Sequence, residues 1–428
     1  MDKYLNFDLE ITKRSDKYQA RVIASPNGEA RHLFDFPFEQ HELEHYSRRL
    51  SQTRSFILNE NAPNNDLNLR NGSVEVIAEE IRDFGKKLFN AVFQKNVSEI
   101  YRESKISAKN KKAGLRIRLR FPENPELINI PWEYLFDSHS DVFLTLSGDT
   151  SIVRYMELSI AVKQMQITPP LKILVISSNP KDYPPLNVKK ELSKLKQALM
   201  PLENKSRVYF KSIEHATLRK ITKTINKHDF HIIHFIGHGD FNQRRKEGVL
   251  VIEDDDGNGL QVSSQRIATI FQSSDASRLI VLNACEGGIT SKENIFSGVA
   301  QSVVKKGVPA VLAMQYVITD RSAIIFSETL YGALSRGSPI DTSLSMARLA
   351  IYNQPNEIEF GTAALYMRAK SGRLFGKDKK KFHLSGDNPL APKRPAKITF
   401  AIFIVTLIAI FASSVFALGL YNLIRGLI

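Results

Sequence analysis

The chain has 428 residues, a single cysteine and a formal net charge of +14. One cysteine excludes an intramolecular disulfide and suits a reducing cytoplasm, and the first residues lack the apolar core of a secretory signal. The positive charge makes nucleic acid and anionic lipid the candidate partners.

The N-terminal part predicts short strands followed by a helix. Residues 4–11 and 18–24 are rich in apolar and β-branched side chains, and Ser25-Pro-Asn-Gly28 has the composition of a turn. We therefore expect strands over about the first 50 residues. Apolar side chains recur at helical spacing over 73–93, which predicts a helix there.

A basic cluster over residues 105–120 holds seven Lys or Arg residues and no acidic residue. Residues 115–121 alternate apolar and charged side chains, which predicts a half-buried strand with Arg116, Arg118 and Arg120 on its solvent face. A solvated or domain-contacting face is the simpler interpretation. An acidic partner or nucleic acid is the alternative.

From about residue 170 the pattern alternates between strands and helices. Apolar strands are predicted at 172–177 and 207–210, with a helix between them that carries apolar side chains along one face over 188–199. This alternation predicts a right-handed, mostly parallel α/β sandwich.

Two segments of this region share one pattern. His231–Asp240 and Arg278–Gly288 each contain a short apolar run followed by a small residue, a reactive side chain and glycine. Such runs are typical of strands buried on both faces of a parallel sheet, and the residues past their carboxyl ends face the crevice that holds the site. The two segments therefore bring His238 and Cys285 to one edge of the sheet.

A thiol beside an imidazole is the pair that nucleophilic catalysis requires. The Cys285 thiolate would attack, and His238 would promote ionisation of the thiol and later protonate the leaving amine. The N–H groups of Gly239 and Cys285 are the expected oxyanion donors. A lone cysteine is otherwise a small buried hydrophobic residue and a lone histidine a structural one. We expect that structural role for His234.

The same segments carry a resemblance to a known family. His238-Gly-Asp240 and Asn283-Ala-Cys-Glu-Gly287 resemble the two signature segments of the CHAT branch of caspase-like cysteine peptidases. The resemblance covers roughly residues 70–375 and includes Pro131–Asp137, Phe143–Ser147, Lys172–Ser177 with the following Pro184-Pro-Leu186, Gly307–Gln315 and Phe360–Tyr366. It implies a caspase-like fold and cofactor-free cleavage of peptide bonds, often in bacterial defence or self-killing pathways.

The substrate pocket is predicted less directly. Relatives that cleave after Lys or Arg carry an acid two residues before the nucleophile, and here Asn283 holds that position. The candidate pocket residues are Asp240, Asn283, Glu286, Gln315 and Asp320. Because acids outnumber arginines around the dyad, we expect a basic or uncharged residue before the scissile bond rather than an aspartate.

No metal site is expected. His231, His234 and His238 lie in one predicted strand, and no Cys or further His completes a ligand set. Glu253-Asp-Asp-Asp-Gly-Asn258 resembles a calcium loop but lacks its terminal glutamate. We therefore interpret this run as a hairpin tip near the active site.

The C-terminal part predicts a membrane anchor. Residues 370–397 hold nine Lys or Arg residues against two Asp, and glycines and prolines over 376–397 indicate a linker. The next 27 residues, 398–424, carry no charge and are long enough to span a bilayer as one helix. The flanking positive charge places the catalytic region on the cytoplasmic side of the inner membrane. Few aromatic side chains accompany the basic residues, which disfavours a nucleic-acid partner.

These patterns together predict four parts. They are an N-terminal α+β region over 1–165, a caspase-like three-layer α/β catalytic domain over 166–375, the linker over 376–397 and one transmembrane helix over 398–424. The predicted function is a membrane-anchored cysteine endopeptidase whose substrate is a protein, such as a pore-forming protein at the same membrane. The alternative is a catalytically silent caspase-like scaffold that recruits partners to the membrane. The sequence is also compatible with a homo-oligomer.

Overall fold

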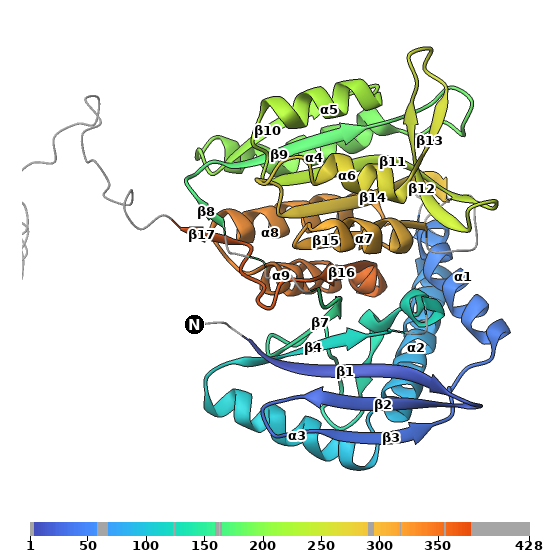
Figure 1. The fold of residues 1–428 in the computed structure, drawn as a ribbon. Helices are drawn as coiled ribbons and strands as arrows, with labels where there is room; N and C mark the ends of the chain where they lie inside the picture. Colours follow the sequence, from blue (N-terminus) through green and yellow to red (C-terminus); the bar gives the residue numbers. More distant parts are fainter. Residues whose placement is uncertain are drawn as a thin grey trace, which may run out of the picture. The chain divides into compact units, whose positions relative to one another are not determined.

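One sheet runs through the described part of the chain, and its strand order decides where the site lies. The computed structural model describes residues 4–57, 67–122, 125–158, 162, 165–289, 295–316, 318–354 and 357–377. Its 13-stranded sheet has the order β10-β9-β11-β14-β15-β16-β7-β4-β1-β2-β3, and β12 and β13 extend it from β11 (Figure 1). The strands are β1 (Tyr4–Arg14), β2 (Lys17–Ala24), β3 (Ala30–Phe34), β4 (Gly114–Arg120), β7 (Thr150–Tyr155), β9 (Leu171–Ser177), β10 (Val208–Ile213), β11 (Ile232–Asn242), β12 (Glu247–Glu253), β13 (Gly259–Ser263), β14 (Leu279–Ile289), β15 (Ala310–Met314) and β16 (Ala363–Met367).

Two groups of parallel strands meet in this sheet. β10, β9, β11, β14 and β15 are parallel to one another, and so are β16, β7, β4 and β1. β15 and β16 are antiparallel at the junction, so the two groups have their carboxyl ends at opposite edges. The prediction of a mixed α/β fold around a large, mostly parallel sheet is confirmed.

Helices cover both faces of the first group. α4 (Val188–Glu203), α8 (Asp320–Ser335) and α9 (Ile340–Tyr352) contribute to one hydrophobic cluster, and α5 (Leu218–Lys227), α6 (Ser264–Phe271) and α7 (Ile295–Lys306) to the other. Alternate residues of β9 enter different clusters: Ile173 and Val175 the first, Leu174 and Ile176 the second. Because both faces are buried, the run Ile173–Ile176 of β9 is apolar without alternation. This arrangement has the three layers expected from the sequence.

Further helices accompany the N-terminal strands: α1 (Gln40–Ile57), α2 (Leu67–Val92) and α3 (Lys95–Asn110). The predicted strands at 4–11 and 18–24 and the helix within 73–93 are confirmed. The expectation of strands up to about residue 50 is wrong after Phe34. Phe38, Tyr46 and Leu50 are buried, and the last two lie four residues apart on one face of α1. The many charged residues between them conceal that stripe in the sequence.

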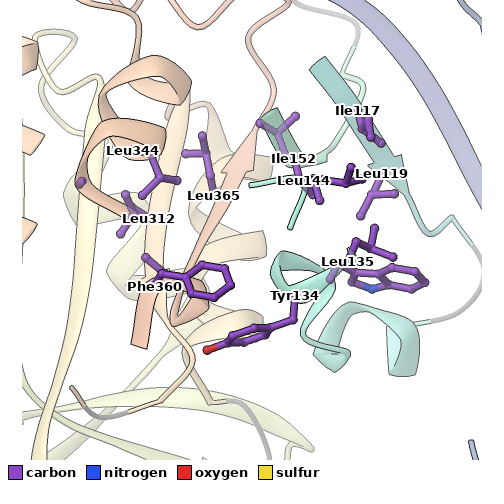
Figure 2. Packing of buried hydrophobic residues seen from close by; sticks show 14 of the residues in the cluster. Ile117, Leu119, Tyr134, Leu135, Leu144, Ile152, Leu312, Leu344, Phe360 and Leu365 are labelled. Carbon is purple, nitrogen blue, oxygen red and sulfur yellow. The ribbon is translucent and has the colours of Figure 1, made fainter. Parts of the chain in front are cut away.

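Short elements lie between the longer ones or after the last of them. They are β5 (Phe136–Asp137), β6 (Val142–Phe143), β8 (Met165–Ile167), β17 (Phe375–Lys377) and the 3-10 helices η2 (Pro125–Asn129), η3 (Trp132–Tyr134) and η4 (Glu357–Gly361). Figure 2 shows Tyr134 of η3 and Phe360 of η4 between the strands that carry Ile117 and Leu312. The rings of Tyr134 and Phe360 lie 5.1 Å apart, edge to face, within one hydrophobic cluster. The N-terminal strands and the later strands thus share a core.

The arginines of β4 do not line a solvent face, so that prediction is wrong. Arg116 and Arg118 are only 1% and 8% exposed. Arg116 forms an ion pair with Asp341 of α9, and Arg118 and Arg120 form ion pairs with Asp8 of β1. An alternating strand shows which side chains share a face but not what covers that face. The other form of the simpler interpretation, a face that contacts another part of the protein, is confirmed, and these guanidinium groups serve the fold.

None of the helices in the described ranges is long and apolar enough to cross a membrane. The predicted transmembrane helix at 398–424, and the linker beyond Lys377, lie outside those ranges.

Candidate active site

The candidate nucleophile and base lie within neighbouring strands of the sheet, not past the strand ends as the sequence predicts, because β11 continues to Asn242 and β14 to Ile289. β11 and β14 are parallel, and their regular pairing runs up to Gly237 opposite Ala284. His238 and Cys285 are the next residues on each strand. The register therefore brings their backbones to the same edge, where parallel α/β sheets hold their sites.

The register changes immediately after Gly237 and Ala284. The next partners are Gly239 and Ile289, so one residue of β11 stands against the four residues 285–288 of β14. Extra residues of this kind interrupt a ladder and are over-represented next to active sites. The side chains of Cys285 and Glu286 lie outside the described part of the chain. The juxtaposition of the two motifs therefore rests on the backbone register.

The His238 side chain is completely buried. Within the described residues, neither of its ring nitrogens has a hydrogen bond of normal geometry. Burial lowers the pKa of His238 below its ordinary value, and the backbone of Pro184 and the Asp240 carboxylate oppose that shift. A lowered pKa keeps the imidazole neutral near pH 7, which is the protonation state that a general base needs.

Tyr183 lies against the His238 ring, with ring centroids 5.3 Å apart and planes inclined by 45°. Its hydroxyl donates a hydrogen bond of 3.3 Å to Asp240. The side-chain amide of Gln261 on β13 donates to the same carboxylate oxygen at 2.8 Å and to the Tyr183 hydroxyl at 3.3 Å. Asp240, a predicted pocket residue, is thus engaged in a side-chain network beside His238.

The loop between β9 and α4, residues 178–187, carries Tyr183 and is tied to the β12–β13 hairpin. The N–H of Asn179 donates to Glu253 at 2.8 Å, and the N–H of Gly259 donates to Asp182 at 2.6 Å. The predicted hairpin tip over 253–258 is confirmed, and Gly257 at that tip has a φ of +83°, a conformation that favours glycine.

The two other histidines of β11 have separate environments. Nδ1 of His234 lies 2.6 Å from the Tyr331 hydroxyl, and burial lowers the pKa of His234 to about 3. His231 accepts a hydrogen bond from the N–H of Lys172, and burial lowers its pKa to about 4. No group of three or more potential metal ligands is found among the described residues.

Two further pocket candidates have partners elsewhere in the fold. The amide of Gln315 is buried, where its oxygen accepts from Arg154 at 2.7 Å and its nitrogen donates to Glu133 at 2.8 Å. Asp320, the first residue of α8, forms ion pairs with Lys190 and Lys194 of α4. Burial raises the pKa of Asp320, but these two ammonium groups hold it below its ordinary value.

The remaining predicted site residues belong to the two strands themselves. Asn283 is half-buried in β14, two residues before Cys285. Gly239, one of the two expected oxyanion donors, pairs with Leu250 of β12 on one side and with Ile289 on the other. Its backbone therefore lies beside the interrupted part of the ladder.

Sequence reasoning did not identify Tyr183 or Gln261. Tyr183 stands in a proline-rich loop without periodicity, and Gln261 is a polar residue of a short strand. Neither position carries a motif. The only signal is the pair of prolines after Tyr183, which are part of the family resemblance.

Comparison with known proteins gives a family and a fold. Residues 82–383, more than half of the chain, match the CHAT domain. A sequence comparison with curated proteins gave no match.

Among solved structures, the chain is similar to Saccharomyces cerevisiae separase in its complex with securin. The TM-score is 0.51 and the sequence identity 11%, over 85% of this chain and 30% of that chain. The similarity is one of fold, and this chain corresponds to less than a third of that separase chain. The Drosophila initiator caspase Dronc matches with a TM-score of 0.29 and 12% identity, over 47% of this chain and 85% of that one. Caspase-1 from Spodoptera frugiperda gives a TM-score of 0.29 and 12% identity, over 50% and 97%.

Proposed function

Since the chain belongs to the CHAT-domain family, we propose that it is a cysteine endopeptidase with Cys285 as nucleophile and His238 as general base. The observation that carries this proposal is the pairing of Gly237 with Ala284, after which the two residues continue on neighbouring strands. The CHAT match and the separase-like fold support the peptidase class.

The proposed reaction uses groups of this chain alone. His238 takes the thiol proton, and the Cys285 sulfur adds to the substrate carbonyl to give a tetrahedral oxyanion. The N–H groups of Gly239 and Cys285 would stabilise that oxyanion. The imidazolium then protonates the leaving amine as the C–N bond breaks. Water, deprotonated by His238, hydrolyses the resulting thioester and restores the thiol.

We also propose that the enzyme acts at the inner membrane. The support is the uncharged segment 398–424 with the basic linker before it. The substrate would be a protein at the inner face of that membrane, such as a pore-forming protein held inactive until it is cut. A tether confines enzyme and substrate to one layer and raises their effective concentration. Defence or self-killing would be the context of such an activation.

The test compares the wild-type protein with Cys285→Ala and His238→Ala. New peptide termini that appear in cells with the wild type, but with neither variant, would identify the substrate. On a peptide derived from that substrate, each variant should lose about three or more powers of ten in kcat, as expected for members of a catalytic unit. Unchanged sets of termini in all three strains would instead favour the scaffold without catalysis.

A further inference from the structure

Tyr183 is the closest described aromatic neighbour of the buried His238 ring, with the inclined contact at 5.3 Å. The residue is half-buried in the 178–187 loop, and Pro184 next to it contributes to the environment of His238 through its backbone. A ring on one side and a backbone segment beside it restrict the rotation of an imidazole.

Tyr183 is itself held in place by two strands. Its hydroxyl is shared with Asp240 of β11 and Gln261 of β13. Its ring lies directly over Gly259, where an added Cβ would come within 2.3 Å of the tyrosine ring. Glycine at 259 therefore permits the close approach of the ring to β13, and the adjacent Asp182 accepts from the Gly259 N–H.

We propose that Tyr183 is a positioning residue that holds the His238 imidazole in its catalytic orientation, with Asp240 and Gln261 fixing the tyrosine. This inference rests on the proposed function of His238. It also gives Asp240 a role other than contact with the substrate. The carboxylate accepts hydrogen bonds from the network, and it is the charged group that acts on His238 within the described residues.

The structure allows the ring and the hydroxyl of Tyr183 to be tested separately. Tyr183→Phe keeps the ring against His238 and removes the bonds to Asp240 and Gln261. Tyr183→Ala removes both. Gly259→Ala leaves Tyr183 intact and pushes its ring away, which provides a second route to the same displacement. Tyr331→Phe is the matched control, because Tyr331 contacts His234 rather than His238.

The readouts are kcat, KM and the pH profile of kcat/KM for the full-length protein. We expect Tyr183→Ala and Gly259→Ala to lower kcat by about tenfold or more with little change in KM, because the transition state and not substrate binding is affected. Because burial lowers the pKa of His238, uncovering the ring raises that pKa, and the acid limb of the profile moves to higher pH. Tyr183→Phe should lower kcat less than Tyr183→Ala does, and Tyr331→Phe should leave the pH profile of kcat/KM unchanged.

The alkylation rate of Cys285 separates this inference from the proposed function. Because Cys285 is the only thiol, its rate with iodoacetamide against pH reports the thiol–imidazole pair without any substrate. If the wild-type protein has no peptidase activity but Tyr183→Ala changes the pH profile of Cys285 alkylation, the positioning role is supported and the proposed peptidase function is refuted. If folded Tyr183→Ala or Gly259→Ala has the same pH profiles of alkylation and cleavage as the wild type, the positioning role is wrong. It is also wrong if Tyr331→Phe changes these profiles as much as Tyr183→Ala does.

Discussion

The ion pair between Arg116 and Asp341 joins the predicted N-terminal region to the predicted catalytic domain, and removal of one partner alone should destabilise the protein strongly. The two side chains are 1% and 0% exposed, and the Arg116 Nε donates to Asp341 at 2.6 Å. Asp341→Asn would leave the guanidinium charge buried without its carboxylate. Breaking one partner of a buried pair costs about 3–5 kcal/mol. Arg116 also donates to Asn6 at 2.9 Å, and this remaining bond places the expected loss near the lower end of that range.

Urea unfolding of the wild type and Asp341→Asn would measure this loss. The exposed pair of Lys17 and Asp35, with side chains 45% and 78% exposed, supplies the control. Asp35→Asn should change the free energy of unfolding by no more than about 1 kcal/mol, because solvent screens an exposed pair. A double replacement, Arg116→Met with Asp341→Leu, should be less destabilising than Asp341→Asn alone, because no charge is left unpaired. Equal losses for Asp341→Asn and Asp35→Asn would refute the argument.

Four further outcomes are expected. Complete alkylation of Cys285 should abolish peptidase activity, and full activity after stoichiometric labelling would disprove the thiol mechanism. His234→Gln should lower the melting temperature and leave the kcat of the folded protein nearly unchanged, because the ring is buried against Tyr331. Lost activity at an unchanged melting temperature would contradict the structural role. In a fluorogenic peptide panel, substrates with a basic or uncharged residue before the scissile bond should be cleaved faster than those with Asp, and the reverse order would be decisive against that preference. A chain truncated after Lys377 should cleave a short peptide at the wild-type rate, while its effect in cells weakens. If truncation abolishes peptide cleavage, the C-terminal segment instead takes part in assembling the active enzyme.

Local patterns predicted the elements around the site because the relevant information is contiguous there. The apolar run Ile173–Ile176 of β9 indicates burial on both faces, and the structure has it between two helical layers. The first part of β11, up to Ile236, and the hairpin tip after Glu253 follow in the same way from an apolar run and from turn residues, whereas the continuation of β11 to Asn242 was not predicted. Each of these features depends on neighbours within a few residues.

Contacts between distant segments could not be predicted in this way. The partner of Arg116 lies 225 residues away, and that of Arg118 lies 110 residues away. The alternating pattern of β4 showed that the arginines share a face, but Asp8 and Asp341 decide that this face is buried. The strand order also depends on contacts between distant segments, because no local pattern indicates that β15 and β16 are antiparallel.

The sequence by itself determined the alternation of strands and helices, the two motifs that carry His238 and Cys285 after apolar runs, and the family that those motifs resemble. Tertiary structure alone decided that Gly237 pairs with Ala284, and that Tyr183 from another loop lies against the base. The physical reason is that periodicity and turn chemistry act within a segment. Register, burial of charge and the packing of one side chain on another arise only when segments far apart in the chain meet.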